Sequence, residues 1–222
     1  MLPFINIHCH QIIGNDLSIQ NIDLLDFSLH QMQHPYSLGL HPWSIEKYEI
    51  SDIKKKLNAT LLKEEKFLMA IGETGIDKGI HIPIKLQENI FKLHIELAAE
   101  LKKPLILHCV RSFNEIHNII RQMKFNMPVI VHGFNNNIHI AKSCFAHGYY
   151  LSFGAALLNE QSNARKVLKA ISNDKFFLET DNSNISIEQI YEAATSIKNI
   201  SIIELLQMQN HNFEVVFKTI NR

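Results

Sequence analysis

The chain has 222 residues, of which 46% are hydrophobic and 20% charged, as in ordinary globular proteins. Lysine plus arginine and aspartate plus glutamate number 22 each, so the formal net charge is zero. This balance argues against a broad basic surface for long nucleic acid, and it leaves a small or single-stranded phosphate substrate open. Because α/β barrels of this length commonly form one domain, we expect a single domain over residues 1–222.

The three cysteines indicate a reducing environment, because an odd number leaves one over from any disulfide pairing. We expect Cys9, Cys109 and Cys144 to be small buried residues. The N-terminal sequence lacks the basic start and apolar core of a signal peptide, and no apolar run reaches the roughly 20 residues of a membrane span. These features predict a cytoplasmic protein without a membrane segment.

Short apolar runs alternate with longer amphipathic stretches along the chain. The runs predict strands over residues 4–10, 17–20, 36–41, 67–72, 104–110, 128–134, 149–154 and 175–180. The stretches predict helices over residues 51–65, 83–102, 112–124, 137–147, 160–171 and 186–197, followed by a terminal helix pair over 200–217. Eight strands alternating with helices predict the α/β class and a (β/α)8 TIM-type barrel.

The second strand is the least regular part of this pattern. Residues 22–28 could form it in place of 17–20, and no helix is evident between the first and third strands. We therefore expect a barrel that is compact or slightly distorted near strand 2. The clearest helix begins at Pro83 and carries an apolar stripe at three- and four-residue spacing, made by Leu86, Ile90, Leu93, Leu97 and Leu101.

Six residues suited to binding a divalent metal stand at or just past the ends of the predicted strands. In a parallel barrel the carboxyl ends of the strands meet at one rim, so residues far apart in sequence converge there. Each histidine taken alone could be a packed core imidazole, but the repeated placement favours a metal site. The six residues are His8, His10, Glu73, His108, His132 and Asp181.

The spacing within this set suggests individual roles. His8 and His10 are two residues apart on a strand and share a face, so both imidazoles can bind one ion. Glu73 could bridge two ions about 3.5–4 Å apart, or it could be a turn or capping carboxylate. Asp181 could bind the first ion and accept a proton from water, with Glu179 as the competing candidate.

The ordered motifs resemble the TatD family of metal-dependent hydrolases over essentially the whole chain. The resemblance is carried by H-x-H at residues 8–10, GLHP with His41, GETGID with Glu73, the strand ending at His108, HGF with His132, and ETD with Asp181, joined by Gln87 and the closing helix over 212–217. It implies one metal held by His8, His10, Asp181 and Glu73, and a second held by Glu73, His108 and His132. It also implies a divalent-metal-dependent deoxyribonuclease, often a 3′→5′ exonuclease.

Several positions depart from the family pattern. Asn6 stands where an aspartate is common before H-x-H, Val110 places Arg111 one position late, and Asn182 follows Asp181. All six proposed ligands are retained, so these departures bear on substrate preference.

The resulting hypothesis is two-metal hydrolysis of a phosphodiester, with Asp181 and Glu73 as catalytic residues and two ions of Mg, Mn or Zn. His41 and Arg111 are candidates to hold the phosphate, although a packed imidazole and a solvated guanidinium are the alternatives. We expect DNA or a short phosphodiester as the substrate, single-stranded, and no obligate protein partner is evident.

Two rival functions stay open. The first is an amidohydrolase-type enzyme that cleaves an amide, ester or lactone, including an aminoacyl ester on tRNA. The sequence has no lysine at a strand end equivalent to Glu73, which favours a carboxylate bridge over a carbamylated lysine. The second rival is a non-catalytic binding protein stabilised by its metals, although structural metal sites are usually closed by protein ligands.

Overall fold

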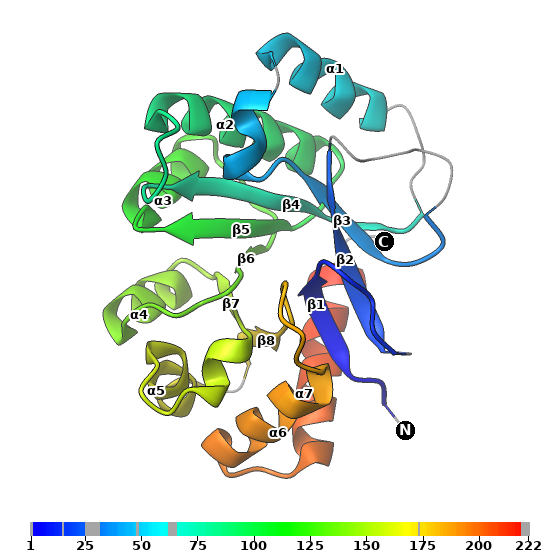
Figure 1. The fold of residues 1–222 in the computed structure, drawn as a ribbon, viewed down its shortest axis with the longest axis vertical. Coiled ribbons are helices and arrows are strands. Elements are labelled where there is room, and N and C mark those ends of the chain that lie inside the picture. The colour runs from blue at the N-terminus through cyan, green and yellow to red at the C-terminus, as the bar shows by residue number, and fades with distance from the viewer. Residues whose placement is uncertain are drawn as a thin grey trace. The chain divides into compact units, whose positions relative to one another are not determined.

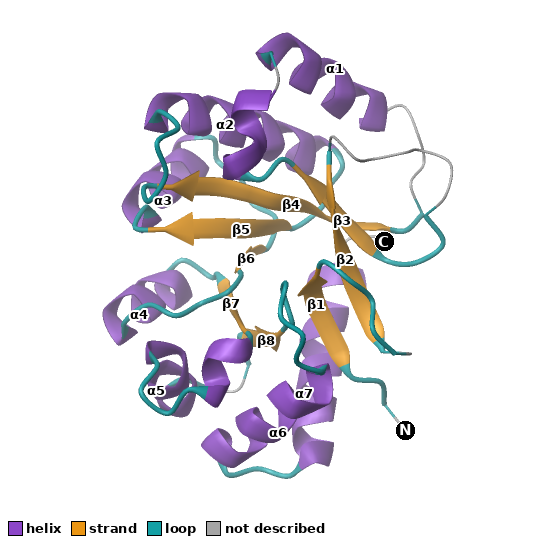
Figure 2. Cartoon of the chain, viewed as in Figure 1, coloured by secondary structure: helices purple, strands orange, loops and turns teal. Residues whose placement is uncertain are grey.

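The computed structural model describes residues 2–14, 16–24, 32–47, 49–61, 66–172 and 174–218, and within these ranges strands alternate with helices (Figure 1, Figure 2). The strands are β1 Ile5–Cys9, β2 Leu17–Asp23, β3 Tyr36–Gly39, β4 Leu68–Asp77, β5 Leu105–Val110, β6 Val129–Val131, β7 Tyr150–Phe153 and β8 Phe176–Leu178. The α-helices are α1 Ile50–Leu61, α2 Ile84–Glu100, α3 Phe113–Gln122, α4 Ile138–Ala146, α5 Asn163–Ala170, α6 Ile187–Lys198 and α7 Ile202–Phe213. Shorter helical turns are η1 Pro42–Lys47, η2 Ala155–Leu158 and η3 Glu214–Lys218.

The chain forms two compact units. The terminal unit comprises Met1–Gln20 and Ile130–Arg222, and the central unit comprises Asn21–Val129. The expectation of one domain over residues 1–222 stays a prediction, and each unit is described by itself.

In the terminal unit the strands run parallel. β6 pairs with β7, β7 pairs with β8, and β1 pairs with the first part of β2. An isolated parallel bridge between Cys9 and Asp181 joins the segment after β8 to β1. Helix α7 packs beside β1 and β8 (Figure 1). The side chains of Gln209 and Asn212 both donate to the carbonyl of Phe176 at 3.0 Å, which ties the helix to the last strand.

In the central unit β3, β4 and β5 are also parallel neighbours. Helix α2 packs on β4, but the buried face of α2 is rotated from the predicted stripe. Leu86, Leu93 and Leu101 are only half-buried, whereas Gln87 and His94 are buried. Ile90 and Leu97 of the predicted stripe are buried as expected. Gln87 and His94 share the buried face because their side chains bond to the backbone of Asp77 in β4 and of Leu40 just after β3.

The strand boundaries correct one expectation about the site. Residues 67–72 were expected to end a strand before Glu73, whereas β4 continues through Glu73 to Asp77 with an irregular register between Ile71 and Thr74. His108 likewise lies inside β5 and not at its end. The glycines beside Glu73 belong to a bulged strand and not to a turn.

The remaining expectations are met with small boundary shifts. β2 includes residues 17–20, while most of the alternative strand over 22–28 lies outside the described residues, as do residues 62–65 of the first predicted helix. The terminal pair over 200–217 is one α-helix followed by a π-helical turn, and Ser201 caps it. Cys9 and Cys144 are buried thiols, and Cys109 is a half-buried one.

Burial raises the pKa of the Cys9 thiol to about 11, which keeps it protonated at neutral pH. Across the described parts of the chain, no helix has the length and apolar character that crossing a bilayer requires.

Candidate metal centre

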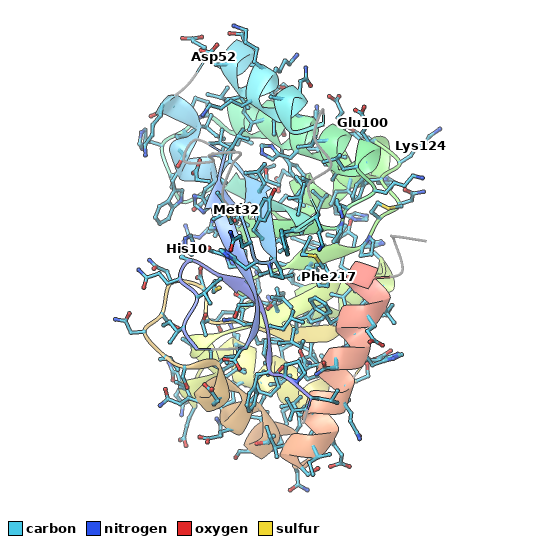
Figure 3. The ribbon with its side chains drawn as sticks, turned by 90° about the vertical axis from the view of Figure 1, so that its right-hand side faces the viewer. His10, Met32, Asp52, Glu100, Lys124 and Phe217 are labelled. Atoms are coloured by element: carbon cyan, nitrogen blue, oxygen red, sulfur yellow. The ribbon has the colours of Figure 1, made fainter. Side chains whose placement is uncertain are left out.

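Strand β1 and the segment after β8 bring three of the predicted ligands together in the terminal unit. The backbone N–H of Asp181 donates to the carbonyl of His8 at 3.0 Å, and the carbonyl of Asp181 accepts from the N–H of His10 at 3.1 Å. Asp181 is therefore held between the two histidines as an added strand residue. His10, labelled in Figure 3, lies just past the end of β1.

The side chains of this terminal cluster (His8, His10 and Asp181) converge on one carboxylate oxygen. Nε2 of His8 and Nε2 of His10 each lie 3.5 Å from Oδ1 of Asp181. Ligand atoms around a zinc-like ion with bonds near 2.1 Å are about 3.4 Å apart, so this donor set has suitable spacing for a divalent cation. His8 is buried, while the Asp181 side chain is 45% exposed and leaves the cluster open to solvent.

The electrostatics of the terminal cluster favour an ionised Asp181. Burial by itself would raise the pKa of this carboxyl, but hydrogen bonds from His10 and His8, with charge on His132 and His8, outweigh it and hold the pKa well below its usual range. A permanently ionised carboxylate beside two imidazoles fits a hard or borderline cation.

His132 and Glu179 lie next to this cluster. The ring centroids of His8 and His132 are 4.4 Å apart. Oε1 of Glu179 accepts from the backbone N–H of Gly133 at 2.7 Å and lies 3.3 Å from Nδ1 of His132. Glu179 is fully buried, so it stands behind His132 and orients the imidazole, whereas Asp181 faces His8 and His10.

A second cluster, the central cluster, consists of His41, Glu73 and His108. Oε1 of Glu73 lies 2.7 Å from Nδ1 of His108 and 3.2 Å from Nε2 of His41. The two imidazoles are themselves 3.2 Å apart, between Nε2 of His41 and Nδ1 of His108. Within each of the two clusters the residues offer one ligand atom each, and these atoms lie within 4.8 Å of one another.

Glycines permit the close backbone packing that forms the central cluster. A Cβ atom at Gly75 would lie 2.0 Å from the carbonyl oxygen of His108, and Gly75 has a φ of +151°. A Cβ atom at Gly39 would lie 2.5 Å from the carbonyl oxygen of Glu73. The glycines of GETG and GLHP are therefore required for β3, β4 and β5 to approach one another.

His41 has a defined tautomer. Its Nδ1 accepts the backbone N–H of Trp43 at 3.2 Å, so the proton of the neutral ring is on Nε2. A protonated Nε2 donates a hydrogen bond and cannot bind a cation. Although His41 lies among the potential ligands, this geometry suits it to donate to an anionic oxygen.

Asp77 holds the other side of His108. Its Oδ2 lies 3.2 Å from Nε2 of His108 and accepts the indole N–H of Trp43 at 2.8 Å. Burial acts to raise the pKa of Asp77, but hydrogen bonds from Trp43, Gly79 and His108 lower it below its usual value. The buried amide of Gln87 pairs with both the N–H and the carbonyl of Asp77, at 2.7 and 3.0 Å.

Arg111, the second predicted phosphate-binding residue, is exposed after β5 in the central unit. Asn6, one of the departures from the family pattern, is buried in the terminal unit. Its amide oxygen accepts the N–H of Thr180 at 3.0 Å and its amide nitrogen donates to Oγ1 of Thr180 at 2.9 Å. Asn6 therefore fixes the residue that precedes Asp181.

The sequence predicts residues that do lie together as potential ligands, but it does not reveal the residues behind them. His8, His10 and Asp181 lie together, as do Glu73 and His108, and His41 joins the latter pair. Asp77, Trp43 and His94 were not singled out, and Glu179 was considered only as a rival to Asp181. The aspartate of GETGID, two residues after Gly75, was the one available signal for Asp77.

Comparison with known proteins places these features in a family. A model of the family described as TatD related DNase matches residues 20–218. The chain is 32% identical over 185 residues to an uncharacterized metal-dependent hydrolase of Buchnera aphidicola subsp. Baizongia pistaciae, covering 81% of this chain and 68% of the relative. It is 25% identical over 199 residues to the uncharacterized metal-dependent hydrolase YcfH of Escherichia coli K12, covering 82% and 73%.

The fold is also found among solved structures. The crystal structure of YJJV, a TatD homolog from Escherichia coli K12, matches with a TM-score of 0.84 over 97% of this chain and 98% of that chain, at 20% identity. This likeness and the parallel strands alternating with helices confirm the predicted (β/α)8 barrel. Because the family model matches most of its length, the chain belongs to the TatD family of metal-dependent hydrolases.

Proposed function

We propose that this chain is a divalent-metal-dependent phosphodiesterase that hydrolyses single-stranded DNA from the 3′ end. The observation that carries the proposal is the pair of histidine–carboxylate clusters, each with ligand-forming atoms within 4.8 Å, in a member of a family described as DNases. DNA is a polymer of phosphate esters, so the proposed reaction is the hydrolysis of an ester bond.

The proposed cofactors are two divalent ions, Mg, Mn or Zn. The first set of ligands is His8, His10, Asp181 and Glu73, and the second is Glu73, His108 and His132. The spacing of the terminal cluster supports the first set, and the contact between Glu73 and His108 supports the second. The sharing of Glu73 and the place of His132 are taken from the family resemblance. When bound, such ions lower the pKa of water and neutralise charge on phosphoryl oxygens.

Asp181 and Glu73 are the proposed catalytic residues. The Asp181 carboxylate is ionised at neutral pH, and its partial exposure lets water reach it. Because its lowered pKa makes it a weak base, proton transfer to it would rely on a water whose own pKa a bound ion lowers. Asp181 orients the attacking water and accepts the proton that water loses as it attacks phosphorus. The buried Glu73 carboxylate supplies negative charge between the imidazoles of the central cluster.

His41 and Arg111 are the proposed phosphate-binding residues. The proton on Nε2 of His41, which lies 3.2 Å from Oε1 of Glu73, would be shared with a phosphoryl oxygen of the substrate. Arg111 carries five N–H donors in a planar fork that matches a phosphate bidentately, and it is exposed in the central unit next to β5. Both contacts would hold the substrate and stabilise charge as it develops on the oxygens.

The test compares three substrate classes with the same metal-loaded protein. A 5′-labelled single-stranded oligonucleotide, a chromogenic phosphodiester and a chromogenic carboxylic ester are each assayed with and without chelator. We expect the two phosphodiesters to be cleaved, the labelled strand to shorten from its 3′ end, and chelator to abolish both reactions. Glu73→Gln should lose activity, whereas Glu115→Gln, a carboxyl-to-amide change on helix α3, should retain it.

Turnover of the carboxylic ester alone would overturn the proposal in favour of an amidohydrolase-type enzyme. No metal-dependent turnover of any substrate, with two ions bound per chain, would favour a metal-stabilised binding protein. The cytoplasmic location predicted from the sequence remains part of the proposal.

A further inference from the structure

The only tryptophan of the chain, Trp43, is largely exposed beside the central cluster. Trp43 lies in η1, the turn that follows His41, and 63% of its surface is accessible. Single exposed apolar residues are common and mean little by themselves. Trp43 differs because its backbone bonds to the imidazole of His41 and its indole bonds to Asp77, which contacts the imidazole of His108.

Two hydrogen bonds fix the indole in place. The backbone N–H of Trp43 donates to Nδ1 of His41 at 3.2 Å, and the indole N–H donates to Oδ2 of Asp77 at 2.8 Å. Asp77 is 3% exposed, so the polar edge of the ring points to a buried carboxylate. The exposed remainder of the ring is an apolar π surface with little freedom to move.

The ring lies next to both imidazoles of the central cluster. Its centroid is 5.2 Å from that of His41 in an edge-to-face arrangement and 6.4 Å from that of His108. A phosphate held by Nε2 of His41 would therefore place one of its flanking nucleotides next to the indole. An immobilised ring costs less entropy on binding than a mobile one.

We propose that Trp43 is a stacking platform for a nucleobase next to the scissile phosphate. Every base has a π face, so stacking on indole binds single strands with little sequence preference. The proposal rests on the proposed phosphodiesterase function and adds to it a preference for nucleotide substrates over plain phosphodiesters. It also requires an unpaired base, since the faces of a base in a duplex are already stacked.

Intrinsic fluorescence tests the proposal without relying on turnover. Because Trp43 is the sole tryptophan, selective excitation reports on it alone. The metal-loaded protein is titrated with a phosphorothioate-linked oligothymidine and with an abasic oligomer of the same length and charge. We expect the oligothymidine to quench Trp43 emission and the abasic oligomer to bind, by competition, without quenching. Equal emission with both bound oligomers would overturn stacking.

Kinetics of variants supply the second readout. We expect Trp43→Leu to lower the ratio of kcat/KM for oligothymidine over abasic oligomer by about tenfold, and Trp43→Phe by much less, because phenylalanine keeps a π face. Ile203→Ala, which removes another exposed apolar side chain on helix α7, is the control and should leave the ratio unchanged.

The outcomes separate this inference from the proposed function. Quenching by oligothymidine without cleavage would overturn the nuclease reaction and keep the platform. Cleavage with an unchanged ratio in Trp43→Leu would overturn the platform and keep the reaction, and would leave the exposed ring for another partner such as a protein. An equal loss on both oligomers would mean that Trp43 acts only through Asp77 and His108, which also overturns stacking.

Discussion

Nε2 of His108 lies 3.2 Å from the buried carboxylate of Asp77. Since the lowered pKa of Asp77 keeps it ionised, the carboxylate accepts and the imidazole donates. The lone pair of Nδ1 is then left for a cation, which would replace the 2.7 Å contact between Nδ1 and Oε1 of Glu73. Asp77 thereby selects which nitrogen of His108 a cation can bind, although Asp77 is not itself among the proposed ligands.

Asp77→Asn should weaken metal binding. An amide carries no charge and can present an N–H to Nε2 of His108, so the ring would lose its orientation and some basicity. Substitutions behind a metal-binding histidine commonly cost about 10- to 100-fold in metal affinity. Calorimetric titration of the metal-free protein with Mn²⁺ measures the change. Glu115→Gln is the control, and unchanged affinity in Asp77→Asn would contradict the role given to Asp77.

Glu179→Gln tests the carboxylate behind His132 in the terminal unit, as Asp77→Asn tests the carboxylate behind His108 in the central unit. The glutamine oxygen can still accept from Gly133 and His132, so we expect the protein to fold. The loss of charge behind His132 should lower metal affinity by about 10-fold or more, with kcat at saturating metal much less affected. Activity measured as a function of metal concentration separates the two effects. A large fall in kcat with unchanged metal affinity would instead make Glu179 a catalytic residue.

Asp181→Asn should mainly lower kcat, whereas Glu179→Gln should mainly lower metal affinity. Removing a general base typically costs about 10²- to 10⁴-fold in rate, and an amide cannot accept the proton of water. We expect kcat to fall by that order even at saturating metal. Asp174→Asn, which changes an aspartate that bonds to Ser172, is the control. A variant whose kcat recovers fully with added metal would show that Asp181 is a ligand only.

Local sequence signals predicted the elements well. Helix α2 was expected over 83–102 and spans Ile84–Glu100. The agreement is close because the start signal at Pro83 and the apolar spacing depend only on residues within one or two helical turns. Strand β4 was expected to end at residue 72 because Gly72 and Gly75 are typical of turns. Gly75 instead allows the backbone to approach His108, a long-range contact that composition does not reveal.

The sequence predicted which residues are potential metal ligands, but it did not predict which side chains hydrogen-bond to those ligands. H-x-H and the motif order identified imidazoles and carboxylates because ligand chemistry is carried by residue type. Which carboxylate stands behind which imidazole depends on how strands pair, and Asp77 and Glu179 look like any other acidic residue in the sequence. The His41 tautomer depends on one backbone N–H in η1, for which the sequence gives no signal.

His94 of helix α2 bonds to the backbone of the residue that precedes His41. Its Nε2 accepts the N–H of Leu40 at 3.0 Å, and its Nδ1 lies 2.8 Å from the carbonyl of Ile90. Burial lowers the pKa of His94 from 6.5 to about 4, although the bond to Ile90 acts in the opposite direction. The folded state therefore holds a neutral imidazole at a pH where the unfolded chain is already protonated.

The sign of the pH dependence follows from linkage. A histidine whose folded pKa lies below its unfolded value contributes stability that is fully present above about pH 6.5 and is lost as the pH falls toward 4. The loss is roughly 3 kcal/mol of unfolding free energy.

His94→Gln keeps an acceptor for Leu40 but does not titrate, so urea unfolding from pH 7 to 4 should show the wild type losing this amount relative to the variant. His211→Gln, at an exposed position of α7, should follow the wild type. Parallel curves for the wild type and His94→Gln would mean that protonation of His94 carries no cost in the folded protein.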